Sequence, residues 1–179
     1  MVRILDIGCG HNKHKGDPGD TVIGLDKTGV TGVDVVWDLE ITPLPFEDKE
    51  FDRVVANDVL EHVQNIIPLL EDVYRILKVG GLFDVRCPFY TNSFSLTSLD
   101  HKHFFGWDSL NFNFPNPFKM KFSIEKRRLV FLPYPKGIFQ KSANYFFSGI
   151  FNRVPELYQK TLAFLLPCGE IEYQLRKRE

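Results

Sequence analysis

Residues with the types and spacing needed to bind a nucleoside lie near the amino terminus. An apolar run ends at Asp6, Gly8 and Gly10 follow one residue apart, and Asp26 comes about twenty residues after Asp6. Glycine lets a backbone turn sharply or approach a ligand closely. A carboxylate at this distance can accept both hydroxyls of a ribose. The pattern predicts a site for an adenosine-containing cofactor, and by itself it does not choose between NAD and another such cofactor.

The residues after the two glycines favour a cofactor without phosphates. NAD sites prefer Gly-x-Gly-x-x-Gly, but Lys13 occupies the third glycine position here. A pyrophosphate also binds at the amino terminus of a helix, and residues 11–20 lack apolar periodicity and contain two glycines and a proline. A nicotinamide-dependent enzyme therefore stays open only as an outside alternative.

A parallel sheet must position these residues, because acids recur where predicted strands end. The apolar run at residues 2–7 is typical of a strand buried on both faces. Apolar residues at helical spacing predict a short helix at 58–63 and a longer one from Asn65 to just before Gly80, with Pro68 in its first turn. Residues 89–100 are predicted to be a loop, 107–111 a short helix, and 138–166 a helical stretch broken at Pro155. The remaining predicted strands are Thr21–Asp26, Val33–Trp37, Phe51–Asn57, Leu82–Cys87, Lys121–Phe131 and Glu170–Arg176.

Six short motifs occur in the order found in one family. Together they resemble the class I S-adenosylmethionine-dependent methyltransferases, particularly small enzymes similar to ubiquinone and menaquinone biosynthesis methyltransferases. The resemblance extends from Met1 to about Pro88. The motifs are Leu5–Gly10, Val22–Asp26, Trp37–Glu40, Leu44–Asp52, Val59–Val63 and Tyr74–Gly81.

The resemblance implies a fold and separate regions for binding the cofactor and the acceptor. The fold is α/β and Rossmann-like, with a seven-stranded, mostly parallel sheet of order 3-2-1-4-5-7-6 flanked by helices. A single domain would fill residues 1–179. Residues 1–88 would bind the cofactor, and residues 89–179 would bind the acceptor and include the aromatic helical insertion 138–166.

The resemblance also implies S-adenosylmethionine as the cofactor and assigns seven residues to it. Gly8 and Gly10 would let the backbone approach the methionine half, and Asp6 would help to position that end. Asp26 would bind the ribose, and Asp38 would accept a hydrogen bond from the exocyclic amine of adenine. The backbone of Leu39 would face the adenine ring, and Asn57 would contact the methionine amino group.

The chain departs from the family pattern in two places. Asn12 stands where a third glycine often occurs, and the connection from Gly10 to Asp20 is too short for the usual full helix. A parallel crossover needs about a dozen residues, so this connection is at the lower limit. The helices that often precede the first strand in the family are also missing, so the cofactor site is expected to be more open or covered by something else.

Methyl transfer requires alignment of two partners more than a catalytic side chain. If the acceptor is a hydroxyl or an enol, a base with a pKa near neutrality would help, which draws attention to histidine. His101 and His103 follow the fifth strand, where the family places substrate residues, and Tyr90 offers a hydroxyl at the pocket mouth. His62 is interpreted as a capping or packing residue. No metal is predicted, because Asp100 is the only carboxylate near the two later histidines.

Composition excludes several classes of protein. A net charge of −1 gives no overall attraction to nucleic acid or to an anionic membrane. Three distant cysteines predict neither a disulfide framework nor structural zinc, which favours a reducing, cytoplasmic setting. No signal peptide is visible and no uncharged stretch reaches the roughly 18 residues of a bilayer span, so a cytoplasmic, soluble protein is expected.

The carboxyl-terminal half suggests the partners. Most of the seventeen Phe residues follow Phe83, which favours a small, apolar or glycan-related acceptor. A homodimer interface or peripheral contact with a membrane surface stays open for 138–166, which is flanked by basic residues. An RNA methyltransferase and a non-catalytic binding module with the same fold are the alternative functions. The RNA alternative rests on two basic clusters, Lys119, Lys121, Lys126, Arg127 and Arg128, and Arg176, Lys177 and Arg178.

Overall fold

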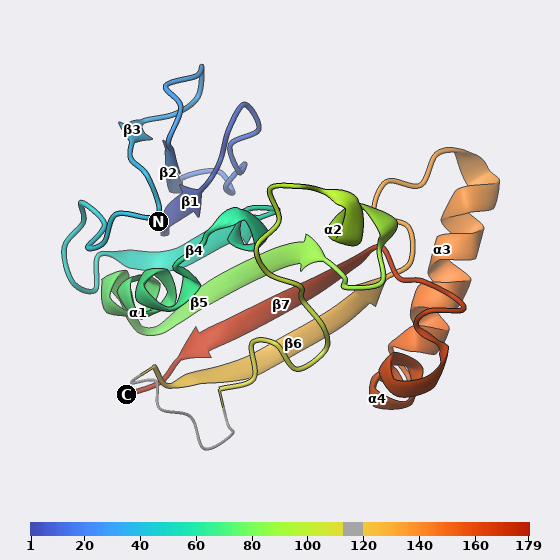
Figure 1. The fold of residues 1–179 in the computed structure, drawn as a ribbon. Helices are drawn as coiled ribbons and strands as arrows, with labels where there is room; N and C mark the ends of the chain where they lie inside the picture. The colour runs from blue at the N-terminus through green and yellow to red at the C-terminus, as the bar shows by residue number, and fades with distance from the viewer. Residues whose placement is uncertain (113–119) are drawn as a thin grey trace.

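A computed structural model describes residues 1–112 and 120–179. Its strands form one sheet in the order β3-β2-β1-β4-β5-β7-β6, and β7 runs antiparallel to both of its neighbours (Figure 1). The other pairings are parallel. The predicted fold class and strand order are therefore confirmed. The strands are β1 Arg3–Ile7, β2 Thr21–Asp26, β3 Val35–Val36, β4 Phe51–Asn57, β5 Leu77–Pro88, β6 Phe122–Val130 and β7 Glu170–Lys177.

The fifth strand begins five residues earlier than the predicted Leu82. Gly80 and Gly81 do not end a helix at a turn; they lie inside β5. Gly80 has a φ of +80°, and the pairing of β4 with β5 shifts register between Phe51 and Arg53. The two glycines thus allow an irregular stretch that lets the strand start directly after the helix.

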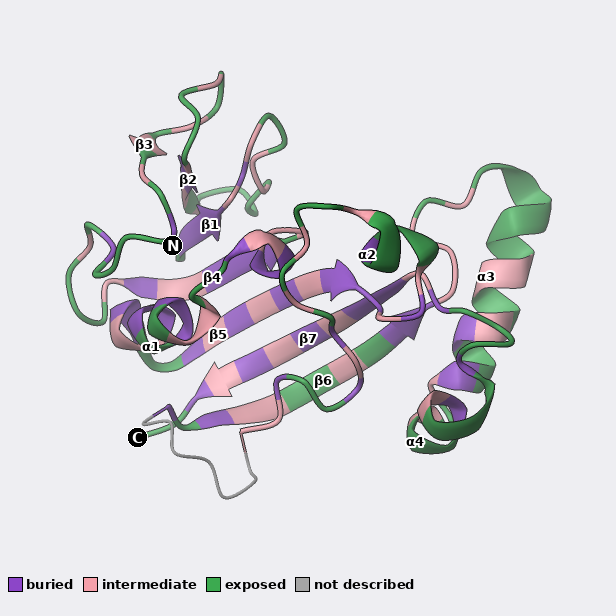
Figure 2. Cartoon of the chain, viewed as in Figure 1, coloured by how far each residue is buried: buried purple, intermediate pink, exposed green. Residues whose placement is uncertain are grey.

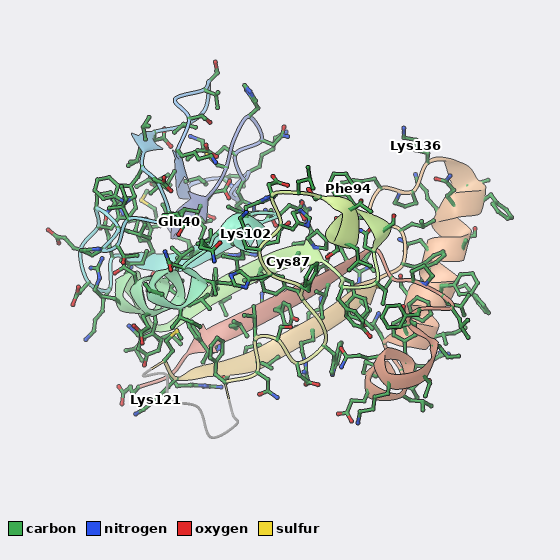
Figure 3. All side chains as sticks on the ribbon, in the orientation of Figure 1. Glu40, Cys87, Phe94, Lys102, Lys121 and Lys136 are labelled. Atoms are coloured by element: carbon green, nitrogen blue, oxygen red, sulfur yellow. The ribbon has the colours of Figure 1, made fainter. Side chains whose placement is uncertain are left out.

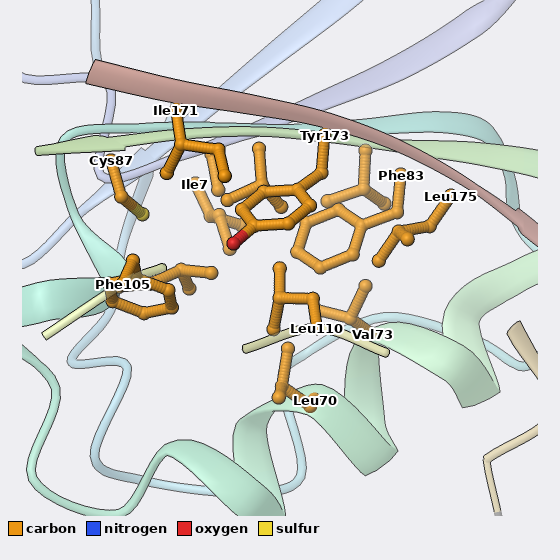
Figure 4. Packing of buried hydrophobic residues seen from close by; sticks show 14 of the residues in the cluster. Ile7, Leu70, Val73, Phe83, Cys87, Phe105, Leu110, Ile171, Tyr173 and Leu175 are labelled. Carbon is orange, nitrogen blue, oxygen red and sulfur yellow. The ribbon is translucent and has the colours of Figure 1, made fainter. Parts of the chain in front are cut away.

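The helix α1 (Ile66–Ile76) covers one face of the sheet. Pro68 lies in its first turn, as predicted, because the first amide groups of a helix need no intrahelical partner. Leu70 and Val73 are at most 2% exposed. Figure 4 shows them directed toward Phe83 and Leu175 of the sheet. This apolar layer holds the strands whose ends form the site.

A mostly irregular segment crosses the same face after β5. It contains the short helix α2 (Ser93–Thr97) in the predicted loop, whereas the helix predicted at 107–111 is absent and successive turns take its place. The amide of Trp107 donates to the side chain of Gln159 at 2.6 Å, and the amide of Gly106 donates to the Ser109 hydroxyl at 2.8 Å. These partners replace the hydrogen bonds of a helical turn.

The aromatic insertion forms helices at one end of the sheet. These are α3 (Gly137–Phe151), α4 (Pro155–Leu157) and the π-helical turn η2 (Tyr158–Leu162). The helical stretch is broken before Pro155, as predicted. Figure 2 shows that most of α3 is exposed. No helix in the described parts of the chain is both long and apolar enough to span a membrane.

Candidate functional site

The glycine turn after β1 shapes the site at the carboxyl edge of the sheet. Gly8 has a φ of +67°, and a Cβ there would lie 2.2 Å from Cγ2 of Val59. Gly10 has a φ of +48° with nothing within 4 Å of an added Cβ. Gly8 is therefore required for packing, whereas Gly10 opens the backbone toward free space, where a ligand can approach it.

A cavity of about 470 Å³ opens beside this turn. It brings together Gly8, Asp26, Asp38 and Leu39, four of the seven predicted cofactor residues. Figure 3 shows Glu40 and Lys102 on this side of the molecule, whereas Lys136 lies at the far end beside α3. The remaining lining residues are Lys27, Glu40, Asp58, Val59, His62, Val63, Asp100 and Lys102.

Asp26 is held at the end of β2 by donors from two loops. Its Oδ2 accepts from the Gly10 amide at 3.0 Å, and its Oδ1 accepts from the Thr28 amide at 2.9 Å and the Thr28 hydroxyl at 2.7 Å. Partial burial opposes ionisation, but these hydrogen bonds outweigh it and lower the pKa of Asp26. The site thus presents a fixed, ionised carboxylate that can accept hydrogen bonds from hydroxyl groups.

Asp38 and Leu39 form a second wall of the cavity. They lie one and two residues beyond Trp37, where the predicted third strand ended. Asp38 Oδ1 accepts from the Glu40 amide at 3.0 Å, and Leu39 is 8% exposed. An acceptor beside an apolar side chain and its backbone suits a flat heteroaromatic ring with an amino group.

The other predicted cofactor residues do not line the cavity. Asp6 is 2% exposed and accepts from the His14 amide at 2.7 Å, so it holds the loop that follows Gly10. Burial raises the pKa of Asp6 despite that hydrogen bond. Gly10 lies beside the cavity through its bond to Asp26. Asn57 is exposed and lines a separate hollow of about 230 Å³ together with charged residues of β4 and β5.

The three predicted catalytic residues occupy different surroundings. The His101 ring lies 4.8 Å from the ring of His62, which lines the cavity. His103 Nε2 is 3.4 Å from the carbonyl oxygen of Gln64. Tyr90 lines another cavity, of about 480 Å³, and its hydroxyl donates to the Gln159 carbonyl at 2.9 Å.

Sequence reasoning missed two acids that follow β4, and it interpreted His62 as a capping or packing residue. Asp58 has a φ of +53° and lines the cavity with His62. Glu61 is 1% exposed, and burial raises its pKa to about 7. The available signal was position, because residues directly after a parallel strand lie at the ligand-binding edge.

The basic clusters are largely neutralised by carboxylates. Arg127 pairs with Asp108 at 2.9 Å, and Arg128 pairs with Glu172 at 3.4 Å. Arg176 and Arg178 both pair with Glu125. Lys119 lies outside the described residues. This arrangement adds no support for an RNA substrate.

Comparison with known proteins agrees with the observed fold. Residues 5–85 match the family model described as a methyltransferase domain. The YcgJ protein of Bacillus subtilis has a TM-score of 0.60 at 18% identity, with 99% of this chain and 92% of that chain covered. An S-adenosylmethionine-dependent methyltransferase from Mesorhizobium loti has a TM-score of 0.58 at 17% identity, with 98% and 91% covered. At such identities these structures support the fold alone.

Three curated relatives are more similar in sequence, over just under half of this chain. Squalene methyltransferase 1 of Botryococcus braunii is 30% identical over 46% of this chain and 26% of its own. The mitochondrial ubiquinone biosynthesis O-methyltransferase of Rattus norvegicus is 31% identical over 45% and 29%. A probable phthiotriol/phenolphthiotriol dimycocerosates methyltransferase of Mycobacterium ulcerans is 33% identical over 47% and 40%. The chain thus spans well under half the length of these relatives.

These matches confirm the resemblance to the class I S-adenosylmethionine-dependent methyltransferases. Residues 5–85 match the model described as a methyltransferase domain, and the sheet has the strand order that the resemblance implies. S-adenosylmethionine is the cofactor of the class. The residues fit it: an open glycine at a positive φ, an ionised carboxylate at the end of β2 and a second carboxylate beside an apolar wall.

Proposed function

We propose that this chain transfers a methyl group from S-adenosylmethionine to a small, apolar or glycan-related acceptor. The observation that carries the proposal is the cavity at the ends of β1 and β2. It combines the Gly8 turn with the fixed carboxylate of Asp26. Asp26 would bind the ribose hydroxyls, Asp38 and Leu39 would bind adenine, and the backbone near Gly10 would face the methionine half.

When bound, the cofactor supplies a methyl carbon whose bond to sulfur breaks as the acceptor atom bonds to it, and sulfur keeps the electron pair. The protein must align the acceptor, exclude water and, for a hydroxyl acceptor, receive its proton. We assign proton acceptance to the imidazole of His101, because it contacts His62 at the cavity wall. His103 and Tyr90 are less well placed, since they contact Gln64 and Gln159 instead.

An apolar acceptor agrees with the surface at the far end of the molecule. The three relatives above are named for squalene, ubiquinone biosynthesis and phthiotriol dimycocerosates. In α3, Phe139 and Tyr145 are 84% and 86% exposed, and Lys136 and Lys141 lie beside them in the sequence. We propose that this face contacts an anionic lipid surface from which the acceptor is drawn. A second copy of the chain is the alternative occupant. Three buried free cysteines agree with a cytoplasmic setting.

Calorimetry with S-adenosylmethionine tests the proposal. Asp26→Ala should weaken binding at least about tenfold, because one lost charge-assisted hydrogen bond is worth about 1.5–3 kcal/mol. The matched control is Asp17→Ala, an exposed acid in the preceding loop, which should leave affinity unchanged. Equal affinities in both variants would contradict the assignment. Binding without turnover on lipid, quinone and glycan acceptors would favour a non-catalytic module, and binding of NADH instead would favour the nicotinamide alternative.

A further inference from the structure

Three metal-ligand side chains meet beside the cofactor cavity. Glu61 and His62 belong to the 3-10 turn η1 (Leu60–His62), and His101 comes from the segment after α2. One ligand-type atom from each residue lies within 4.8 Å of those of the other two. The backbone fixes this meeting, because the Lys102 amide donates to the Glu61 carbonyl at 2.6 Å. We call these residues the Glu61–His62–His101 cluster.

Both imidazoles are oriented by an acceptor at Nδ1. His62 Nδ1 lies 3.1 Å from Oδ2 of Asp100, and His101 Nδ1 lies 3.2 Å from the carbonyl oxygen of Ser95. A proton held on Nδ1 by such an acceptor leaves the Nε2 lone pair free. Histidine ligands of metals almost always donate their other ring N–H to a carboxylate or a carbonyl in this way.

Glu61 lacks a partner for one carboxylate oxygen. The side chain is 1% exposed, and Oε2 has no hydrogen-bond partner among the described residues. The Cys87 thiol hydrogen-bonds to the same carboxylate. Burying an unpaired carboxylate oxygen is costly, and native proteins avoid it unless a cation or donor compensates. The free oxygen therefore points to a positively charged ligand, to which ring nitrogens of the two histidines can also bind.

We propose that the Glu61–His62–His101 cluster binds a divalent transition metal of the zinc type. Two histidine nitrogens and one carboxylate are the ligands of open, catalytic zinc sites, in which another position remains for water or substrate. Nitrogen ligands disfavour Mg²⁺ and Ca²⁺, which take oxygen. Tetrahedral ligands with metal bonds of about 2.0–2.2 Å lie about 3.3–3.6 Å from one another, so ligand atoms within 4.8 Å need to approach by at most about 1.5 Å.

The metal would serve the proposed methyl transfer, and this second step rests on that function. His62 and Asp100 line the cavity, so a metal in the cluster lies at its wall. An oxygen atom of the acceptor can complete the coordination there. A coordinated hydroxyl has a lowered pKa and becomes a better nucleophile at neutral pH. With the ion bound, its proton would pass to solvent water, because the His101 lone pair that accepts it in the metal-free protein would bind the metal.

Titration of chelator-treated protein with Zn²⁺ and Co²⁺ tests metal binding without turnover. Calorimetry should give one bound ion, and Co²⁺ should develop visible absorption from nitrogen and oxygen coordination. Glu61→Gln, His62→Ala and His101→Ala should each weaken the affinity at least about tenfold. His103→Ala, two residues from His101 and outside the cluster, should leave it unchanged.

Two outcomes would overturn the site. One is the absence of saturable binding by the folded wild type, and the other is an equal loss in His103→Ala and His101→Ala. If Glu61→Gln fails to fold by circular dichroism, His101→Ala decides, because that residue is only partly buried. Titration of S-adenosylmethionine into the metal-free protein separates the two proposals. Cofactor binding without metal binding would contradict only the metal site, and metal binding without cofactor binding would contradict only the proposed function.

Discussion

The helices α1 and α3 are both rich in apolar residues, yet they use them in opposite ways. In α1, Leu70 and Val73 are buried against the sheet, whereas in α3, Phe139 and Tyr145 are more than four-fifths exposed. Figure 2 shows this difference along the two helices. The sequence pattern predicted that both segments would be helical, but it did not determine which face of α3 would contact the rest of the protein.

The polar stripe of α3, instead of its apolar residues, holds part of the helix to the sheet. Side chains spaced four residues apart meet the backbone at the end of the edge strand β6 and just beyond it. Asn144, Ser148 and Asn152 accept hydrogen bonds from the amides of Leu132, Phe131 and Leu129, at 2.9, 2.9 and 2.8 Å. Unpaired amides of an edge strand need partners, and this need orients the helix. Phe151 and Ser148 alone are buried within α3.

Removal of a buried side chain from α1 should have the largest effect. Leu70→Ala deletes methyl groups from a 2% exposed position and leaves a cavity under the helix. We expect the free energy of unfolding to fall by about 2–5 kcal/mol in chemical denaturation. A loss below about 1 kcal/mol would mean that α1 packs no more tightly than α3.

Each end of β7 carries a buried charged residue, and the two residues differ in how well they are paired. Lys177, near α1, donates to the carbonyls of Tyr74 and Leu77 at 2.6 and 2.8 Å. Within residues 1–112 and 120–179, the Glu170 carboxylate at the other end of β7 has one ion-pair partner, Arg86, at 3.8 Å. Burial, with the charges of Asp58 and Glu172, raises the pKa of Glu170 from 4.5 to about 7.

The Glu170→Gln variant should therefore change the pH dependence of stability. Between pH 4.5 and about 7 the folded state retains a proton that the unfolded state has lost, so wild-type stability falls as pH rises through this window. Glutamine removes that loss, and the variant should gain at most about 3 kcal/mol relative to wild type above pH 7. Denaturation at pH 5 and pH 8 measures the gain, and parallel profiles for the two proteins would refute it.

The polar attachment of α3 predicts a smaller, local effect. The Asn152 side chain also donates to the Leu129 carbonyl at 2.7 Å, so Asn152→Ala leaves both backbone groups of Leu129 without this partner. We expect a loss of about 1–3 kcal/mol and faster hydrogen exchange at the end of β6. Ser142→Ala, on the exposed side of the same helix, is the control and should change neither quantity.

The outer face of α3 should contribute least to stability and most to lipid binding. Phe139→Ser with Tyr145→Ser should change the free energy of unfolding by no more than about 0.5 kcal/mol per site. The double variant should lose sedimentation with phosphatidylglycerol vesicles. Ile41→Ser with Val79→Ser removes exposed apolar side chains outside α3 and should retain it. Equal vesicle binding by both double variants would contradict the lipid proposal. A wild-type dimer that stays intact in the presence of vesicles would instead favour a second copy of the chain as the occupant of this face.

Local rules were sufficient where the backbone itself makes the site. The glycine turn, the acid at the end of β2 and the helical periodicity of α1 are each encoded in a few neighbouring residues, and the structure confirms these elements. The seven-strand order followed from the family resemblance, because no local pattern specifies which strands pair.

The rest depended on contacts between distant segments. His62 and His101 are far apart in the chain, and the backbone bond from Lys102 to Glu61 brings them together. The turns at 107–111 likewise depend on Gln159. The early start of β5 depends on a register shift against β4, which cannot be seen in the residues of β5 alone.

The side chains of α3 that occupy the end of β6 also bear on self-association. A strand with free amides at the border of a sheet can template the addition of a strand from another molecule. Because Asn152 and Ser148 already satisfy the amides of Leu129 and Phe131, this stretch offers an incoming chain no ladder to extend. The protein can therefore expose an adhesive aromatic helix while the adjoining border resists the growth of continuous sheets between molecules.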